Sequence, residues 1–317
     1  MPTVKKNSPK PLQLVLPATS ANLGPGFDAA ALAFNLYLRV DARLARQFSI
    51  EATGRDADVC RELKDNLILT TYSDVLRSQR KEPQPLKLRI KNEAPIGKGC
   101  GSSASARLAG IALANHFGRL KWGDEQIIAE ASRREHHPDN ASACWLGGVT
   151  VSRMSSDSNK SGDGDRVQTL RVLPPGKWPL LLAVPEERLS TEKARAALPA
   201  TYSRADAVVN IQNSMLLLAA LMQGRRDLLA SALEDRIHQP YRAALCPLLP
   251  ALSELTGQRG VLGVALSGAG PSVLVFLDPK VSLAHCRKLV AAHLAKKGLW
   301  AELLNTAISS HGANRGG

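Results

Sequence analysis

The stretch PIGKGCGSSASARLAG, residues 95–110, combines glycines with hydroxyl side chains in a way that suits phosphate binding. Gly97, Gly99 and Gly101 alternate, so the backbone can approach a ligand closely because no Cβ stands in the way. Ser102 and Ser103 follow at the predicted start of a helix, where free N–H groups and a partial positive charge favour anions. An ordinary turn before a helix of small residues would have the same composition, so this segment alone leaves both interpretations open.

The stretch matches neither of the two commonest phosphate-binding fingerprints. A Walker loop ends in Gly, Lys and then Ser or Thr, whereas Lys98 here precedes the last two glycines. The dinucleotide fingerprint G-x-G-x-x-G does not fit strictly alternating glycines either. The glycines and serines together suit a di- or triphosphate, with a serine hydroxyl as a hard oxygen ligand for Mg²⁺.

Three further stretches concentrate polar side chains next to glycines: residues 17–30, 134–148 and 266–272. Each could be a polar turn when taken alone. Four such loops in one chain predict an active site assembled from loops, which is where functional residues concentrate. The polar side chains that stand out in the first two of these stretches are Ser20, Asn22, Asp28, Glu135, His137, Asp139 and Asn140.

The elements that must position these loops form two groups. Residues 11–150 mix short strands with helices, including one that begins at Ser102 or Ser103 and stops at Gly118. The second half is predicted to run strand, helices, strand, strand, helix, strand, which indicates an α+β fold with an antiparallel sheet. The polar, Gly- and Ser-rich segment 155–166 is predicted to be a surface loop between two domains, 11–165 and 166–310. The glycine-rich C-terminal residues 311–317 are predicted to be disordered.

The segment DAVVNIQNSMLLLAALMQG, residues 206–224, predicts a strong helix. Its apolar side chains recur at helical spacing, and we interpret the stripe as core packing. The stripe consists of Val208, Ile211, Met215, Leu218 and Met222.

Composition limits the class of protein. Of 317 residues, 44% are hydrophobic and 22% charged, as in ordinary globular proteins, and on this basis we expect no apolar run to approach the ~20 residues of a membrane helix. Five widely spaced cysteines without C-x-x-C argue against disulfides or a cysteine-rich zinc site and favour a reducing cytoplasm. The net charge of +13 invites a nucleic-acid partner, but the basic residues are scattered and aromatic residues are only 4%. We expect neither nucleic acid nor membrane as a partner.

Taken together, PATSANLGPGFD, PIGKGCGSSASA, HPDNASACWLGG and GVALSGAGPS resemble the homoserine kinase family of the GHMP small-molecule kinases, over residues 12 to about 308. Sugar and mevalonate kinases usually carry Gly-Glu-His in the first motif, where this chain has Gly-Pro-Gly-Phe-Asp. The resemblance implies a two-domain α+β fold. Its N-terminal domain would be mixed α/β with a left-handed βαβ crossover, and its C-terminal domain ferredoxin-like.

The resemblance also implies an activity. The family transfers the γ-phosphoryl group of MgATP to the hydroxyl of L-homoserine, which makes O-phospho-L-homoserine for threonine biosynthesis. It implies a cytoplasmic enzyme and, often, a homodimer, although no segment of the sequence indicates an interface. In this chain Glu135 and Ser102 would lie on the Mg²⁺ side, and Asn66 matches an adenine-side position but would equally suit a helix cap. The ATP loop would comprise Pro95, Ile96, Gly97, Lys98, Gly99, Cys100, Gly101, Ser102 and Ser103.

The substrate residues carried over from the family fall into chemical classes. Asn22 and Asp28 would bind the homoserine ammonium, and Arg195 and Arg242 would clamp its carboxylate, a role that suits bidentate guanidinium groups. Asn140 would lie at the reacting hydroxyl. The remaining pocket residues would be His137, Thr191, Gly268 and Gly270.

Two points stay open within this reading. Asp139 is a candidate general base, but phosphoryl transfer depends mostly on positioning and charge neutralisation, so we expect that no base is required. His136 and Cys100 stand where the family often has Gly and Leu, and Cys100 beside the site raises the question of sensitivity to thiol reagents.

Other functions remain as alternatives. Another GHMP kinase with a different hydroxy substrate is one, but a substrate without a carboxylate would not need both Arg195 and Arg242. A basic nucleic-acid-binding protein is another, with a steep salt dependence as its signature. A catalytically inactive relative is disfavoured by the intact glycine loop, Ser102 and Glu135.

Overall fold

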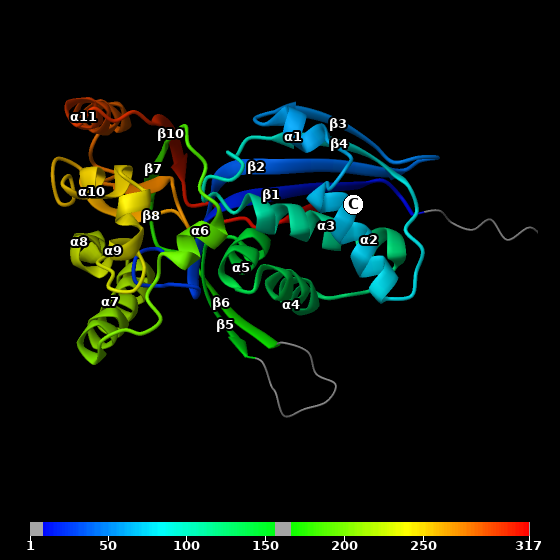
Figure 1. The fold of residues 1–317 in the computed structure, drawn as a ribbon, viewed down its shortest axis with the longest axis horizontal. Coiled ribbons are helices and arrows are strands. Elements are labelled where there is room, and N and C mark those ends of the chain that lie inside the picture. The colour runs from blue at the N-terminus through cyan, green and yellow to red at the C-terminus, as the bar shows by residue number, and fades with distance from the viewer. Residues whose placement is uncertain (1–8, 156–165, 317) are drawn as a thin grey trace, which may run out of the picture.

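A computed structural model describes residues 9–155 and 166–316, which form two α/β parts side by side (Figure 1). The first part is built on a seven-stranded sheet with the path β11-β1-β2-β4-β3, to which β5 is added on β2 and β6 on β5. Only β3 and β4 pair in parallel, and the other pairs of this sheet are antiparallel. The strands are β1 (Leu12–Ala21), β2 (Ala30–Leu44), β3 (Ser49–Gly54), β4 (Leu86–Asn92), β5 (Val149–Ser155), β6 (Arg166–Val172) and β11 (Asn314–Gly316).

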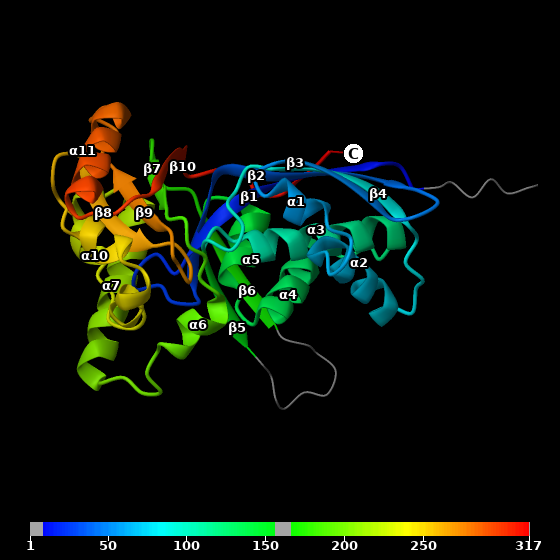
Figure 2. The same cartoon turned by 45° about the horizontal axis from the view of Figure 1, so that its top comes forward.

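Helices cover one face of this sheet (Figure 2). Alternating apolar residues of the strands, such as Leu14, Val40 and Leu88, pack against buried side chains of the helices, such as Tyr72 and Leu108, to form the first core. The helices of this part are α1 (Ala57–Arg61), α2 (Leu67–Ser78), α3 (Ser102–Gly118), α4 (Asp124–Glu135) and α5 (Asp139–Leu146). The glycine loop therefore leads directly into the buried helix α3, as the sequence predicts.

The second part has a four-stranded antiparallel sheet in the order β10-β7-β9-β8. In chain order this is 4-1-3-2 with helices between the first two and the last two strands, so the predicted ferredoxin-like α+β arrangement is confirmed. The strands are β7 (Pro179–Val184), β8 (Val261–Leu266), β9 (Val273–Leu277) and β10 (Glu302–Ala307). The helices are α6 (Thr191–Ala196), α7 (Arg204–Gln223), α8 (Leu229–Ala232), α9 (Gln239–Arg242), α10 (Leu248–Ser253) and α11 (Leu283–Lys296).

The two parts share a core. Strand β7 is buried on both faces, which explains its continuous apolar sequence PLLLAV. Leu181 packs with α10 and α11, whereas Leu180 and Leu182 pack with α7, α8 and residues of the first sheet such as Phe34. The site loops lie along this shared boundary and are therefore held by both parts.

The segment between the two parts, the C-terminal residues and the β3–β4 pair each bear on an expectation from the sequence. The segment 155–166 lies, apart from its two end residues, outside the described residues, and the boundary at 165/166 stays a prediction; β6, which follows it, pairs with β5 of the first sheet. Part of the C-terminal segment expected to be disordered instead forms β11 on the edge of β1. The parallel β3–β4 pair, connected through α1 and α2, is where the left-handed crossover is expected, and its handedness stays a prediction.

The interpretation of the α7 stripe as core packing is wrong. Leu217 and Leu221 on the opposite side of α7 are buried, whereas Ile211 and Met215 are 59% and 70% exposed. Helical spacing identifies an apolar stripe but does not say which side of the helix meets the protein. With 20 residues and a mean hydropathy of 1.4 in its best window, α7 is also long and apolar enough to cross a membrane by those two criteria, contrary to the sequence-based estimate.

Candidate active site

One cavity of about 130 Å³ collects the predicted site loops from both parts of the chain. The β1–β2 loop, the glycine loop and the segment before α5 contribute from the first part. Helix α6, helix α9 and the β8–β9 turn contribute from the second. The predicted residues that line it are Asn22, Asp28, Gly97, Gly99, Cys100, Gly101, Ser102, Ser103, Glu135, His137, Asp139, Asn140, Thr191, Arg195, Arg242, Gly268 and Gly270.

The glycine loop is fixed by its neighbours on both sides. The Thr19 N–H donates to the Cys100 carbonyl at 3.2 Å, and the Ser267 hydroxyl donates to the Gly99 carbonyl at 2.7 Å. A Cβ on Gly99 would lie 2.1 Å from the Ser267 carbonyl oxygen, and one on Gly101 would lie 1.9 Å from the Thr19 hydroxyl. Both glycines also have positive φ, so the close packing and the backbone conformation each require glycine.

The N-terminus of α3 faces the cavity beside Glu135, the last residue of α4. The Ser103 hydroxyl donates to the Glu135 carboxylate at 2.6 Å, and Arg107 one turn further along α3 forms an ion pair with it. Ser102 instead accepts a hydrogen bond from the Gly97 N–H at 3.4 Å. The structure thus brings Ser103 to Glu135, while the assignment of Ser102 to the metal stays a prediction. A carboxylate and hydroxyls at a helix N-terminus are donors that fit Mg²⁺ bound to phosphates.

A second cavity of about 700 Å³ continues from the glycine loop on the other side of Gly97, Ser102 and Ser103. Its wall is largely apolar and includes Ile68 and Ile96. Asn66 also lines it, but the Asn66 side chain accepts from the N–H groups of residues 68 and 69 and donates to the carbonyls of residues 60 and 62. The helix-cap role of Asn66 is therefore present, and a contact with adenine stays a prediction.

The substrate side of the first cavity carries two guanidinium groups with different surroundings. Arg195 on α6 makes a bidentate ion pair with Asp28. Arg242 on α9 is only 1% exposed, and its Nε donates to the Ala194 carbonyl at 3.1 Å. Among the described residues no carboxylate lies within ion-pair distance of Arg242. Burial and the nearby Arg195 lower the pKa of Arg242, yet a guanidinium stays protonated at neutral pH.

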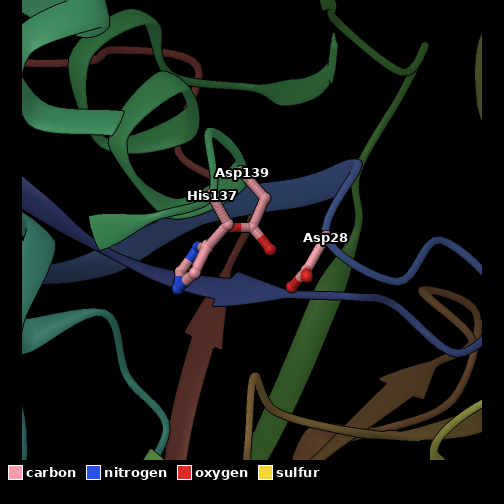
Figure 3. Close-up of side chains that lie close together, drawn as sticks. All are labelled: Asp28, His137 and Asp139. Carbon is pink, nitrogen blue, oxygen red and sulfur yellow. Dashed lines mark hydrogen bonds and ion pairs between the residues drawn. The ribbon is translucent and has the colours of Figure 1, made fainter. Parts of the chain in front are cut away.

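Asp28, His137 and Asp139 form the acidic wall of the cavity (Figure 3). One ligand atom from each lies within 4.8 Å of the others. The Asp139 carboxylate accepts from His137 Nδ1 and from the Asn140 N–H, both at 2.6 Å. Burial alone would lower the pKa of His137, but the hydrogen bond to Asp139 and the Asp28 charge raise it above its ordinary value. The carboxylates of Asp28 and Asp139 in this wall are acceptors of the kind that a cationic ligand group needs.

Asn140 is held at the centre of the site by a residue that sequence reasoning did not identify. The Thr19 hydroxyl on β1 donates to Asn140 Oδ1 at 2.7 Å. That bond leaves the Asn140 Nδ2 group within 3.4 Å of Asp139 and fixes the orientation of the amide. Thr19 lies in the first motif, but nothing in its local sequence distinguishes it from other strand threonines.

His238 is a second residue that the sequence did not indicate. Its side chain is fully buried between Arg242 and the β1–β2 loop, and its ring stacks on Phe27 with centroids 5.2 Å apart. An Arg242 N–H points at His238 Nδ1 at 3.2 Å, and His238 Nε2 lies 2.8 Å from the Gly24 carbonyl. Because the arginine can only donate and the carbonyl can only accept, this histidine is neutral with its proton on Nε2. Burial lowers its pKa.

Three residues that were expected in the ATP loop, Pro95, Lys98 and Cys100, have surroundings that a simple ligand contact does not explain. Pro95 and Lys98 line neither cavity, and the Lys98 ammonium donates to the Pro185 carbonyl at 2.7 Å across the two parts. Cys100 is only 1% exposed, and burial raises its pKa to about 12. The thiol is therefore protonated at neutral pH, which argues against the reactivity that its position had suggested.

Comparisons with known proteins agree with this geometry. Residues 66–148 match the family model of the GHMP kinases N terminal domain, and residues 217–294 match that of the GHMP kinases C terminal region. The chain is 46% identical over 265 residues to a homoserine kinase of Solibacter usitatus, which covers 84% of each chain. It is 34% identical over 305 residues to a homoserine kinase of Deinococcus radiodurans, covering 96% of each. The fold is shared with a crystal structure of homoserine kinase from Cytophaga hutchinsonii, with a TM-score of 0.76, 23% identity and coverage of 96% and 97%.

Proposed function

The chain belongs to the homoserine kinase family of the GHMP small-molecule kinases, and on that premise we propose that it transfers the γ-phosphoryl group of ATP to the hydroxyl of L-homoserine. The product would be O-phospho-L-homoserine, an intermediate of threonine biosynthesis. The family membership fixes the reaction class. The residue roles below rest on the geometry of the cavity.

One observation carries the choice of substrate: Arg242 is a buried guanidinium without a carboxylate partner that lines the cavity. A buried charge without a partner is strongly unfavourable, so this group requires an anion from the ligand. Arg195 lies beside it, and two guanidinium groups suit a carboxylate bound through several hydrogen bonds. A sugar or another neutral alcohol would leave Arg242 unpaired.

The opposite wall suits the ammonium of an amino acid. Asp28 and Asp139 supply negative charge, and the Asn22 side chain donates to the Gly268 carbonyl at 2.8 Å, which holds the β1–β2 loop against the β8–β9 turn. With the ammonium at Asp28 and the carboxylate at the arginines, the hydroxyl end of the substrate would extend toward Asn140 and the glycine loop. Thr191, His137 and Gly270 would close the remaining space around it.

The glycine loop and the apolar cavity would bind ATP. The adenine would enter the cavity beside Ile68 and Ile96, and the phosphates would lie on the free N–H groups at the start of α3. Glu135, with Ser102 or Ser103, would hold Mg²⁺, which would neutralise charge on the transferring phosphoryl group. Replacement Glu135→Gln should then shift the Mg²⁺ dependence of activity to higher concentrations, and an unchanged dependence would argue against this role.

A general base is not part of the proposed mechanism. The Asp139 carboxylate is 1% exposed and already accepts hydrogen bonds from His137 and the Asn140 N–H. It therefore orients Asn140 at the reacting hydroxyl and adds to the negative wall. The proton of the substrate hydroxyl could pass late to the phosphoryl group itself, as a loose transition state allows.

The state of the cysteines bears on the cellular setting. All five cysteines are buried free thiols, which supports a reducing, cytoplasmic location. We propose a small-molecule substrate and a homodimer, and we expect no nucleic-acid or membrane partner. The scattered basic residues behind the net charge of +13 are not accounted for by one ATP.

The direct test is ADP release from MgATP with L-homoserine, L-threonine, L-serine, mevalonate, galactose or buffer alone as acceptor. Activity confined to L-homoserine supports the proposal. Strong activity with mevalonate or galactose would place the chain with a different GHMP kinase activity and would void the carboxylate clamp. Binding of ATP without turnover of any acceptor would contradict the proposed reaction.

A further inference from the structure

The ring of Phe27 lies against both arginines of the proposed carboxylate clamp. Phe27 belongs to the β1–β2 loop and directly precedes Asp28. The guanidinium carbons of Arg195 and Arg242 lie over the ring, 5.5 and 5.3 Å from its centroid. The ring of His238 stacks on it as well, with the centroids 5.2 Å apart. Both arginines are therefore within the ~6 Å at which an aromatic face attracts a cation.

The Phe27 ring is placed behind these groups and not on the surface that the substrate meets. Arg195 and Arg242 line the substrate cavity, whereas Phe27 does not. Phe27 instead lines a separate, mostly apolar cavity of about 240 Å³, together with residues of β5 and α7 such as Val151 and Leu218. Any effect of Phe27 on the substrate must therefore pass through the groups that its ring contacts.

The two guanidinium groups need a support that a carboxylate does not supply. Arg242 donates to two backbone carbonyls and to His238, and burial together with the neighbouring Arg195 lowers its pKa. Arg195 is paired with Asp28, but Asp28 is the group proposed to bind the substrate ammonium. A planar guanidinium stacks well on an aromatic face, and that contact stays available when Asp28 turns to the ligand.

The loop that carries this ring is held on both sides of it. The Pro25 carbonyl accepts from the Asn210 amide at 2.9 Å and from the Ser214 hydroxyl at 2.8 Å, which ties the loop to α7. The Gly26 carbonyl accepts from two N–H groups further along the loop, at 3.0 and 2.9 Å. The backbone on either side therefore fixes the position from which the ring meets the arginines.

We propose that Phe27 is a positioning residue of the carboxylate clamp, whose ring holds the guanidinium groups of Arg195 and Arg242 in the orientation that receives the substrate carboxylate. This inference rests on the proposed function, because it assigns the carboxylate to these two arginines. Without the aromatic face both groups stay charged but are free to move. Binding of the carboxylate then weakens, while phosphoryl transfer from a bound substrate is unaffected.

Two substitutions separate an aromatic support from simple packing. Phe27→Leu fills the space with apolar atoms but offers no aromatic face. Phe27→Tyr keeps the face, and the adjoining cavity has room for the added hydroxyl. Phe27→Leu should raise the KM for L-homoserine about tenfold, within the range of cation–π contacts, and leave kcat and the KM for ATP near the wild-type values. Phe27→Tyr should keep all three constants close to those of the wild type.

Three controls distinguish positioning from a general role in the fold. L-Homoserinol lacks the carboxylate, so its kcat/KM should not respond to Phe27→Leu. The effect of Phe27→Leu should shrink when Arg195→Ala is already present, because both changes act on the same contact. Phe48→Leu is the matched aromatic control, since the Phe48 ring packs edge-on against Tyr72 in the first core, and it should leave the KM for L-homoserine unchanged.

Steady-state kinetics with these variants decides the matter. A tenfold rise in KM that is confined to L-homoserine, absent in Phe27→Tyr and reduced by Arg195→Ala supports the inference. Equal losses for L-homoserine and L-homoserinol, a loss in Phe27→Tyr as large as in Phe27→Leu, or fully additive effects would each overturn it. Phe27→Met, which also lacks an aromatic face, replaces Phe27→Leu if circular dichroism shows the latter to be unfolded. A wild type that phosphorylates other acceptors but not L-homoserine would instead refute the proposed function, and this inference with it.

Discussion

Arg195 and Asp28 form a bidentate ion pair in the lining of the cavity, with N–O distances of 2.7 and 3.0 Å. One residue belongs to α6 of the second part and the other to the β1–β2 loop of the first. These two groups are also the ones proposed to receive the carboxylate and the ammonium of the substrate. The substrate zwitterion would therefore carry the same pair of charges that Arg195 and Asp28 satisfy in each other.

Loss of the Arg195 charge should weaken binding of the amino-acid substrate selectively. We expect Arg195→Ala to lower kcat/KM for L-homoserine about a hundredfold, in the range observed when one partner of a hydrogen-bonded charge pair is removed. The KM for ATP should change little, because Arg195 does not line the apolar cavity. Steady-state kinetics with each substrate varied in turn measures both effects.

The matched control is Arg133→Ala, which removes an exposed arginine of α4 that pairs with Glu130 away from the cavity. A second acceptor, L-homoserinol, has the ammonium and the hydroxyl but no carboxylate. Its turnover should be poor with the wild type and little affected by Arg195→Ala. Equal losses for homoserine and homoserinol would mean that Arg195 acts on the fold rather than on the carboxylate.

Replacement of Asp139 separates a positioning role from a catalytic base. An asparagine can still accept hydrogen bonds from His137 and from the Asn140 N–H, so Asp139→Asn should keep kcat within about tenfold of the wild type. A general base contributes typically 10²–10⁴-fold, so a loss in that range, together with a changed pH–rate profile, would assign the base role to Asp139. Asp139→Ala should lose more than Asp139→Asn, because it also leaves the Asn140 N–H without an acceptor.

The sequence predicted the part of the site that local chemistry dictates. Gly99 and Gly101 have positive φ and no room for a Cβ, so glycine is required there whatever surrounds the loop. The same physics explains His136, which stands where the family often has glycine. His136 ends α4 with a φ of 64°, in the left-handed region that glycine adopts without strain.

The rest of the site depends on tertiary contacts that leave no local pattern. Thr19, Arg107 and His238 are single polar residues, and each matters only through the residue that it contacts. These partners are Asn140, Glu135 and Arg242, respectively. The prediction that the apolar stripe of α7 packs in the core failed for a related reason. Its spacing is correct for a helix, but only the position of α7 on the second part decides that Leu217 faces the core and Met215 faces outward.

Cys100 should not react with thiol reagents in the folded enzyme. With a pKa of about 12, the thiolate fraction at pH 8 is on the order of 10⁻⁴, and the Cys100 side chain is buried within the glycine loop. Activity should therefore survive an hour of treatment with N-ethylmaleimide, whether or not MgATP is present. Mass spectrometry should show five alkylated cysteines only after denaturation. Rapid inactivation that MgATP prevents and that Cys100→Ser abolishes would contradict the burial.

We expect the fold and the binding of the substrate both to require His238 in its neutral form. Because burial depresses its pKa in the folded state, unfolding takes up a proton below the ordinary pKa of about 6.5, and stability should fall as the pH drops below that value. His238→Asn keeps an acceptor in the place of Nδ1 for Arg242, whereas His238→Gln keeps a donor in the place of Nε2 for the Gly24 carbonyl. Both variants should lose less unfolding free energy than the wild type between pH 7 and pH 5, as measured by denaturant titration. Only His238→Gln should raise the KM for L-homoserine, about tenfold, since one hydrogen bond to a charged group is lost. Equal KM values for the two variants would show that His238 supports the fold without positioning Arg242.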